Sequence, residues 1–120
     1  MNAKIVTIIP VFNAEQFLER TLDSVINQTF KEIKIICVND ASTDKTLQIL
    51  EEYAKKDERI VIINNLENKG PGNSRNIGLD YVYENLPEVE YISLVDADDR
   101  IEPNTYERAY EEAKKINADI

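Results

Sequence analysis

The chain has 120 residues, the length of one small domain with a core of its own. Its 23 acidic and 14 basic residues leave a net charge of -9, which argues against a nucleic-acid-binding surface because such surfaces are basic. Histidine is absent, which excludes Ser-His-Asp and Cys-His catalysis and zinc sites built on imidazole.

The first predicted elements are a strand and an amphipathic helix. The β-branched run Lys4–Ile9 predicts a strand that ends at Pro10. Asn13 then predicts a helix N-cap, with Gln16 at the capping-box position. The helix behind this cap would bury apolar residues that recur at helical spacing: Leu18, Leu22, Val25 and Ile26.

A second strand is predicted over Ile33–Val38 and is followed by a polar loop. Cys37, the only cysteine, lies inside this apolar run, so we expect a buried, reduced core residue. Ser42 or Thr43 can cap the next helix. That helix would bury one face: Leu47, Leu50 and Ala54.

The second half of the chain repeats the alternation of strands and helices. A strand is predicted over Arg59–Ile63, a loop over residues 64–72 and a helix over about 73–83. A fourth strand is predicted over Glu90–Val95, and Pro103 suits the first turn of a last helix. The apolar face of that helix is expected to be Tyr106, Ala109, Tyr110, Ala113 and Ile116.

Four strand–helix units predict one α/β domain over residues 1–120, with a Rossmann-like, mostly parallel sheet and helices on both faces. Ligands of such sheets bind beyond the carboxyl ends of the strands. Four polar segments follow these ends, and we expect them to form one crevice: residues 10–13, 39–44, 68–76 and 96–99.

The strand end at Val95 leads directly into Asp96, Asp98 and Asp99. Carboxylates held close together repel each other unless a cation lies between them. If the segment is extended, Asp96 and Asp98 point the same way. The arrangement predicts a site for Mg²⁺ or Mn²⁺, which would neutralise a departing diphosphate. The alternative is an ordinary acidic loop after a strand.

Two aspartates near the second strand have different expected roles. Asp40 follows the strand directly, where its carboxylate could accept a hydrogen bond from a ring N–H such as that of uracil. For Asp44 the favoured interpretation is structural, as an acid in the first turn of a helix.

The segment around Gly70 and Gly72 could let the backbone approach a ligand, and Arg75 follows as a cation for phosphate or for the strand-end carboxylates. The alternative for the whole segment is a turn followed by a surface helix, in which Gly78 would serve close helix packing.

Four segments in this order resemble the motifs of family 2 glycosyltransferases: residues 9–14 (IPVFNA), 38–44 (VNDASTD), 68–78 (NKGPGNSRNIG) and 96–99 (DADD). Those enzymes have the GT-A fold, use a nucleotide sugar, commonly a UDP-sugar, with Mg²⁺ or Mn²⁺, and invert the transferred sugar. The resemblance therefore implies hexosyl or related transfer to a saccharide or lipid-linked acceptor, in polysaccharide or cell-envelope biosynthesis. It implies a cytoplasmic protein, either free or peripheral at the inner face of the membrane, and allows a homo-oligomer.

By this resemblance, Asp40 would bind uracil, Asp98 would ligate the metal and Asp99 would orient the metal shell. The residues expected to bind the nucleotide are Pro10, Phe12, Asn13, Asp40, Gly72, Arg75 and Asp96.

Family members also carry a second half that supplies the acceptor site and the catalytic base, an Asp or Glu. No residue of this chain matches that base, so we expect a donor-binding half cut short before the acceptor half, and the alternative is a naturally short module. In both cases the 120 residues alone should not transfer sugar efficiently.

Two other classes stay open on the residues alone. One is a non-catalytic nucleotide-binding module. The other is a phosphohydrolase that uses the Asp-x-Asp pair, although such enzymes place that pair after the first strand.

Overall fold

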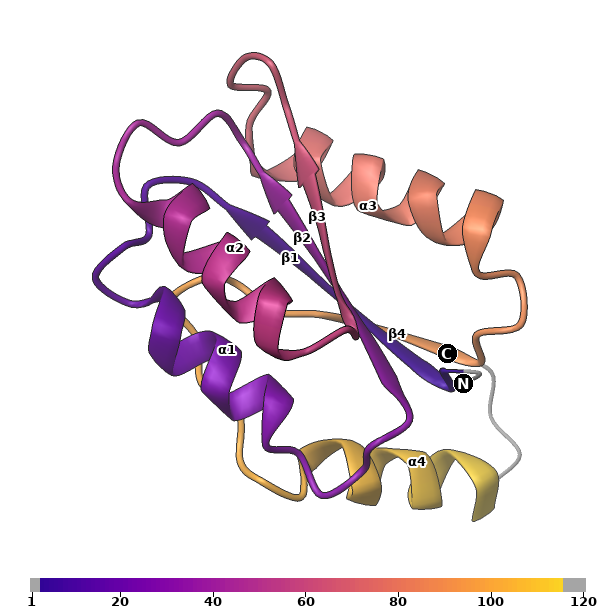
Figure 1. Cartoon of the computed structure of the whole chain (residues 1–120). Helices are drawn as coiled ribbons and strands as arrows, with labels where there is room; N and C mark the ends of the chain where they lie inside the picture. The colour runs from indigo at the N-terminus through magenta and orange to yellow at the C-terminus, as the bar shows by residue number, and fades with distance from the viewer. Residues whose placement is uncertain (1–2, 116–120) are drawn as a thin grey trace.

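A computed structural model describes residues 3–115 and contains one parallel sheet of four strands in the order β3-β2-β1-β4 (Figure 1). The strands are β1 (Ile5–Val11), β2 (Ile33–Asn39), β3 (Ile60–Asn64) and β4 (Tyr91–Leu94). The helices are α1 (Leu18–Ile26), α2 (Thr46–Lys56), α3 (Pro71–Asn85) and α4 (Thr105–Lys115). The predicted Rossmann-like α/β fold is confirmed.

The apolar residues of the strands are divided between two cores, one on each face of the sheet. On one face, Ile9 and Ile35 pack with buried residues of α1, α2 and α4, such as Leu22 and Tyr106. On the other face, Ile8 packs with residues of α3. Figure 1 shows α1 and α2 on one side of the sheet and α3 on the other. Burial on both faces explains why these strands are almost continuously apolar.

Cys37 lies within β2 and is fully buried, as expected. Burial removes the thiol from water and raises its pKa to about 12, because the thiolate would be poorly solvated. The thiol therefore serves as a small apolar core group.

Pro10 does not end the first strand, which continues to Val11. Pro10 pairs with Val38 on β2. The N–H of Val95 donates to the carbonyl of Ile8, so Ile8 faces β4. Backbone groups of a parallel strand alternate between its two neighbours, so Pro10 also faces that side. The β4 ladder has already ended there, and the missing N–H of proline interrupts no hydrogen bond.

The predicted helix caps are wrong for α1 and α2. The N-cap of α1 is Phe17 and that of α2 is Lys45, and neither forms a side-chain capping hydrogen bond. Asn13 instead bonds to both Ser42 and Thr43 across two loops, and these contacts between distant segments compete with local capping.

The last helix begins later than expected and buries less of its predicted face. It starts at Thr105, two residues after Pro103. Tyr106 and Ala113 are buried, whereas Ala109 is exposed. Ile116 lies outside the described residues. None of the helices within residues 3–115 is long and apolar enough to cross a bilayer.

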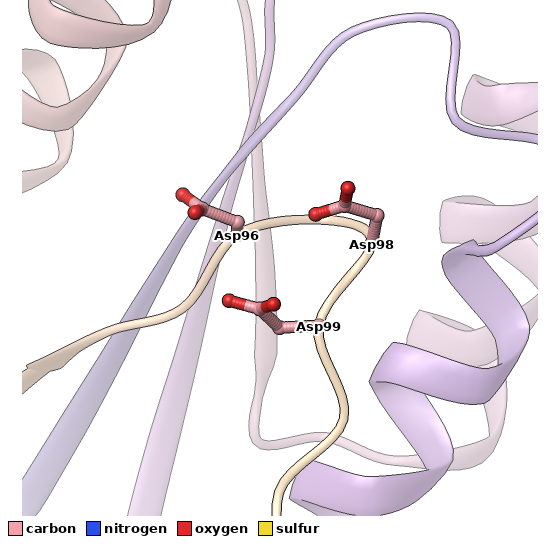
Figure 2. Close-up of side chains that lie close together, drawn as sticks. All are labelled: Asp96, Asp98 and Asp99. Carbon is pink, nitrogen blue, oxygen red and sulfur yellow. The ribbon is translucent and has the colours of Figure 1, made fainter.

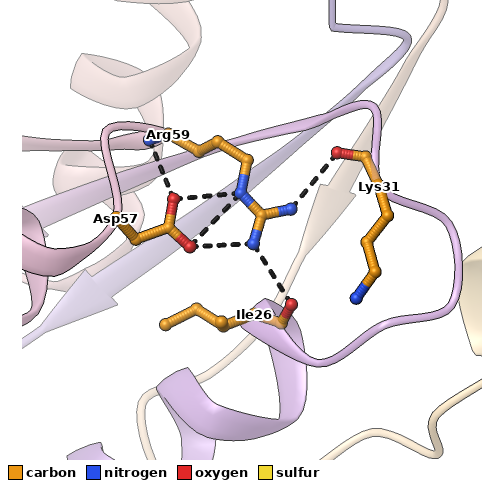
Figure 3. Close-up of polar contacts among 4 residues, drawn as sticks. All are labelled: Ile26, Lys31, Asp57 and Arg59. Carbon is orange, nitrogen blue, oxygen red and sulfur yellow. Dashed lines mark hydrogen bonds and ion pairs between the residues drawn. The ribbon is translucent and has the colours of Figure 1, made fainter.

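The C-terminal end of α1 is held by Arg59, which lies just before β3 (Figure 3). Its guanidinium donates to the carbonyl oxygens of Ile26, at 3.1 Å, and Lys31, at 3.2 Å. The carboxylate of Asp57 fixes the guanidinium through an Nη2–Oδ2 contact of 2.8 Å. The hydrogen bonds that Arg59 donates to this carboxylate lower the pKa of Asp57. The cation also suits the negative end of the helix dipole.

Gly78 brings α3 close to the sheet, which confirms its predicted packing role. A Cβ at this position would lie 2.6 Å from Cγ2 of Ile8, a branch atom of a fully buried side chain. The helix backbone therefore approaches β1 as closely as glycine allows.

Gly78→Ala should lower the free energy of unfolding by about 1–3 kcal/mol, because overpacking outweighs the better helix propensity of alanine. Gly72→Ala is the matched control, since a Cβ there meets no atom within 4 Å. Urea unfolding of both variants tests this, and equal stability of the two would contradict the packing argument.

Candidate functional site

The carboxyl ends of the parallel strands lie at one edge of the sheet, and a cavity of about 320 Å³ opens there. Pro10 and Phe12 from the end of β1 line it together with Asp40 from the end of β2. The loop before α3 and the first turn of that helix complete the wall with Asn68, Gly70, Pro71 and Ser74. Three of the predicted nucleotide residues thus share one cavity.

The carboxylate of Asp40 organises the loop before α3. Oδ1 accepts from the N–H of Lys69 at 2.8 Å and from Nδ2 of Asn65 at 2.9 Å, while Oδ2 accepts from the N–H of Gly70 at 2.9 Å. A carboxylate has about four acceptor positions, so these three hydrogen bonds leave one position, on Oδ2.

Asp40 is only 2% exposed, and its charge depends on these donors. Burial alone would raise its pKa, but the hydrogen bonds from Asn65, Lys69 and Gly70 outweigh burial and lower it. A buried, ionised carboxylate therefore lies in the wall of the cavity.

Asn65 and Ser74 support this carboxylate but were not predicted from the sequence. The amide of Asn65 donates to Asp40 and also lies 3.2 Å from Oγ of Ser74, which is fully buried. The position of Asn65, two residues after the predicted strand Arg59–Ile63 and directly after β3, was the available signal. The role of Ser74 depends on a contact with a residue nine positions earlier, which no local pattern reveals.

Asn13 has a structural role at the rim of the site. Its backbone has φ 46°, in the left-handed region that asparagine tolerates. Its Oδ1 accepts from the N–H of Thr43 at 2.8 Å, and its own N–H donates to Oγ of Ser42 at 3.0 Å. The loops after β1 and β2 are therefore joined, although Asn13 does not line the cavity.

Asp44 joins the same two loops and has the structural role expected of it. Its carboxylate accepts from the N–H of Thr46 at 2.9 Å and from the N–H of Glu15 at 3.3 Å. Burial would raise its pKa, but these hydrogen bonds lower it. It lies just before α2 rather than within the first turn.

Asp96, Asp98 and Asp99 gather around one turn of the chain after β4 (Figure 2). One carboxylate oxygen from each lies within 4.8 Å of the others, and all three side chains are exposed. The segment is a turn closed by the N–H of Asp99 on the carbonyl of Asp96, at 3.0 Å, rather than an extended chain. The turn thus adds Asp99 to the expected pair.

This oxygen cluster suits a hard divalent cation. Oxygen ligands of Mg²⁺ lie about 2.1 Å from the metal, so opposite ligands are about 4.2 Å apart. Small side-chain rotations would bring the three oxygens into that range. One or two carboxylates commonly suffice, because substrate phosphates and water fill the other positions.

The structure does not bring every predicted site residue to the cavity. Gly72 is exposed and Arg75 half-buried in the first turns of α3, and neither lines the cavity. Asp96 and Asp98 lie on the separate loop after β4 and do not line it either. A larger hollow of about 590 Å³, between α1 and residues 100–103, contains none of the predicted residues.

Comparison with known proteins decides the family. The profile of "Glycosyl transferase family 2" matches residues 6–120. The chain belongs to glycosyl transferase family 2. Glycosyltransferase GlyA of Streptococcus pneumoniae is 42% identical over 117 residues, which cover 98% of this chain and 16% of that protein. The poly(ribitol-phosphate) beta-glucosyltransferase of Bacillus spizizenii is 41% identical over 120 residues, with shares of 98% and 18%.

Solved structures show the same fold. Residues 1–349 of Staphylococcus aureus TarS in complex with UDP superpose with a TM-score of 0.84 at 33% identity, covering 93% of this chain and 32% of that one. The mannosyltransferase PcManGT of Pyrobaculum calidifontis, solved with GDP-Man and Mn²⁺, has a TM-score of 0.81 at 20% identity and shares the fold. The superposition covers 94% of this chain and 33% of the PcManGT chain. This family 2 chain therefore spans a third or less of the length of these relatives.

Asp40→Asn should lower the free energy of unfolding by about 1–3 kcal/mol near pH 7, because an amide NH₂ would face backbone donors. The lowered pKa of Asp40 stabilises the fold above the unfolded value of about 3.9, and this stabilisation is lost as the pH falls through the folded pKa. The difference in the free energy of unfolding between wild type and Asp40→Asn should therefore become smaller below about pH 4.

Urea unfolding at several pH values measures this gap. Asp80→Asn, at an exposed position on α3, is the matched control and should show no comparable gap at any pH. A gap for Asp40→Asn that does not depend on pH would contradict the assigned ionised state.

Proposed function

We propose that this chain forms the donor-binding part of an inverting glycosyltransferase that uses a UDP-sugar. The observation that carries the proposal is the cavity at the carboxyl edge, with the ionised Asp40 in its wall and Phe12 at its mouth. The free acceptor position on Oδ2 of Asp40 suits the ring N–H of uracil. The ring of Phe12, 51% exposed, offers an apolar face to the base.

The relatives support a uridine nucleotide and an envelope polymer. TarS has been solved with UDP and with UDP-GlcNAc, at 33% identity to this chain. The Bacillus spizizenii relative is a poly(ribitol-phosphate) beta-glucosyltransferase. We therefore propose a UDP-sugar as donor and a hydroxyl of a saccharide or lipid-linked polymer as acceptor, with the protein in the cytoplasm or at the inner face of the membrane.

In this proposal Asp98 is the metal ligand, Asp96 contacts ribose or sugar, and Asp99 orients the metal shell. A bound Mg²⁺ or Mn²⁺ would supply the positive charge that stabilises the departing diphosphate, which matters for a chain with a net charge of -9. Gly72 and Arg75, at the start of α3, are assigned to the diphosphate side, where a helix N-terminus and a guanidinium both favour an anion.

We further propose that the acceptor site and the catalytic base belong to a part of the enzyme other than residues 1–120. The base would remove the proton of the acceptor hydroxyl, which then attacks the anomeric carbon from the face opposite the leaving diphosphate. In-line attack of this kind inverts the anomeric configuration.

Asp98→Ala should weaken Mn²⁺-dependent binding of UDP by at least about tenfold, or about 1.4 kcal/mol, with little loss of fold because the side chain is exposed. Calorimetric titration of UDP with and without Mn²⁺ measures the effect. Asp80→Ala, on α3, is the matched control. Unchanged UDP affinity of Asp98→Ala in the presence of Mn²⁺ would count against the metal assignment.

The alternative function is a non-catalytic nucleotide-binding module, which predicts UDP binding without sugar transfer. The discriminating measurement is hydrolysis or transfer from UDP-sugars by the full-length protein. We expect turnover by that protein and none by residues 1–120 alone. Efficient turnover by the 120 residues would refute a base outside them.

A further inference from the structure

A stripe of polar side chains runs along α1 and just past its end. The stripe consists of Thr21, Ser24 and Gln28, whose spacing of three and four residues places them on one side of the helix. Thr21 and Gln28 are fully buried. Buried polar groups destabilise a fold unless they are hydrogen-bonded, so the partners of this stripe show what it is for.

Each member of the stripe bonds to the backbone of residues 97–102, a segment that begins inside the aspartate turn. Oγ1 of Thr21 donates to the carbonyl of Ala97 at 2.7 Å. The N–H of Ile101 donates to Oγ of Ser24 at 3.2 Å, and Nε2 of Gln28 donates to the carbonyl of Glu102 at 2.6 Å. The contacts follow the same order along both segments. Residues 97–102, which form no helix or strand, are therefore held along the side of α1.

The hydroxyl of Thr21 could simply fold back on its own helix, as threonine often does. The carbonyl of Phe17 does lie 3.3 Å from Oγ1. A hydroxyl has one proton, however, and the contact with Ala97 is shorter by 0.6 Å. The principal hydrogen bond therefore leaves the helix and reaches the peptide between Asp96 and Asp98.

The carboxylates of the three aspartates contribute nothing that would hold this loop. Among residues 3–115, the side chains of Asp96, Asp98 and Asp99 form no hydrogen bond or ion pair. The loop is shaped by backbone contacts: Val95 N–H to the carbonyl of Ile8 at 3.1 Å on one side, and the Asp96–Asp99 turn in the middle. The contact with Thr21 lies on the turn itself, at Ala97 between Asp96 and Asp98.

We propose that Thr21 is a positioning residue that fixes the Asp96–Asp99 turn for metal binding, while Ser24 and Gln28 hold the chain that follows this turn. The role in metal binding rests on the proposed function. The hydrogen bonds from Thr21, Ser24 and Gln28 to residues 97–102, here called the tether, do not depend on it. Outer-sphere groups that orient metal ligands typically change metal affinity 10- to 100-fold when removed.

The experiment uses the full-length protein with three variants. Thr21→Val keeps the shape and removes the donor, and Thr21→Ser restores the hydroxyl. Thr7→Val is the matched control, because Thr7 is equally buried and its hydroxyl bonds to that of Tyr106, at 2.7 Å, and not to the turn. The measurement is the Mn²⁺ dissociation constant in the presence of UDP.

We expect the dissociation constant to rise by about tenfold in Thr21→Val and by no more than about twofold in Thr21→Ser and Thr7→Val. An unchanged value in Thr21→Val overturns the proposal. An equal rise in Thr7→Val also overturns it, because the effect would then reflect general loss of stability.

Amide hydrogen exchange of residues 96–101, measured without metal or nucleotide, separates this proposal from the proposed function. Exchange should be faster in Thr21→Val than in wild type and unchanged in Thr7→Val. If wild type binds no Mn²⁺ with UDP but exchange rises as expected, the proposed function fails and the tether stands. Unchanged exchange in Thr21→Val overturns the tether.

Discussion

The pairing of β1 with a parallel strand on each side is the constraint on which the rest of the molecule depends. Ile5 is in register with Ile33 on one side and Tyr91 on the other, so the carboxyl ends of three strands are fixed at one edge. The two ladders differ in length, because β4 stops opposite Ile8 while β2 continues opposite Val11. The cavity beside Phe12 and Asp40 lies at the end of the longer ladder, and the acidic turn after β4 does not line it.

The aspartates at this edge fall into two groups with different physical roles. Asp40 and Asp44 accept backbone hydrogen bonds and join loops that are about 30 residues apart in sequence. The carboxylates of Asp96, Asp98 and Asp99 face solvent, and the turn that carries them is held by other groups. Aspartates that hold loops together and aspartates that stay exposed are thus distinguished by their hydrogen-bond partners, not by residue type.

Sequence reasoning located every strand to within one or two residues, because buried parallel strands are β-branched and continuous, as Ile33–Asn39 is. It also foresaw the close approach at Gly78. The sequence-based prediction failed where a distant contact overrode a local signal. Asparagine is a common helix N-cap, but Asn13 bonds to Thr43 instead. The hydroxyl of Thr21 was missed for the same reason, since its partner lies 76 residues away. Pro10 could remain inside β1 because the neighbouring strand β4 stops before it. The sequence of β1 alone does not reveal where β4 stops.

The complete burial of Cys37 gives this chain an internal reporter. Its side chain lies in the middle of β2, with strands on both sides and helices over both faces, and its pKa is raised to about 12. A thiol reagent needs both access and a thiolate, and the folded sheet supplies neither. Alkylation of this single thiol therefore proceeds only as fast as the strands separate, so labelling kinetics record how often the central sheet opens.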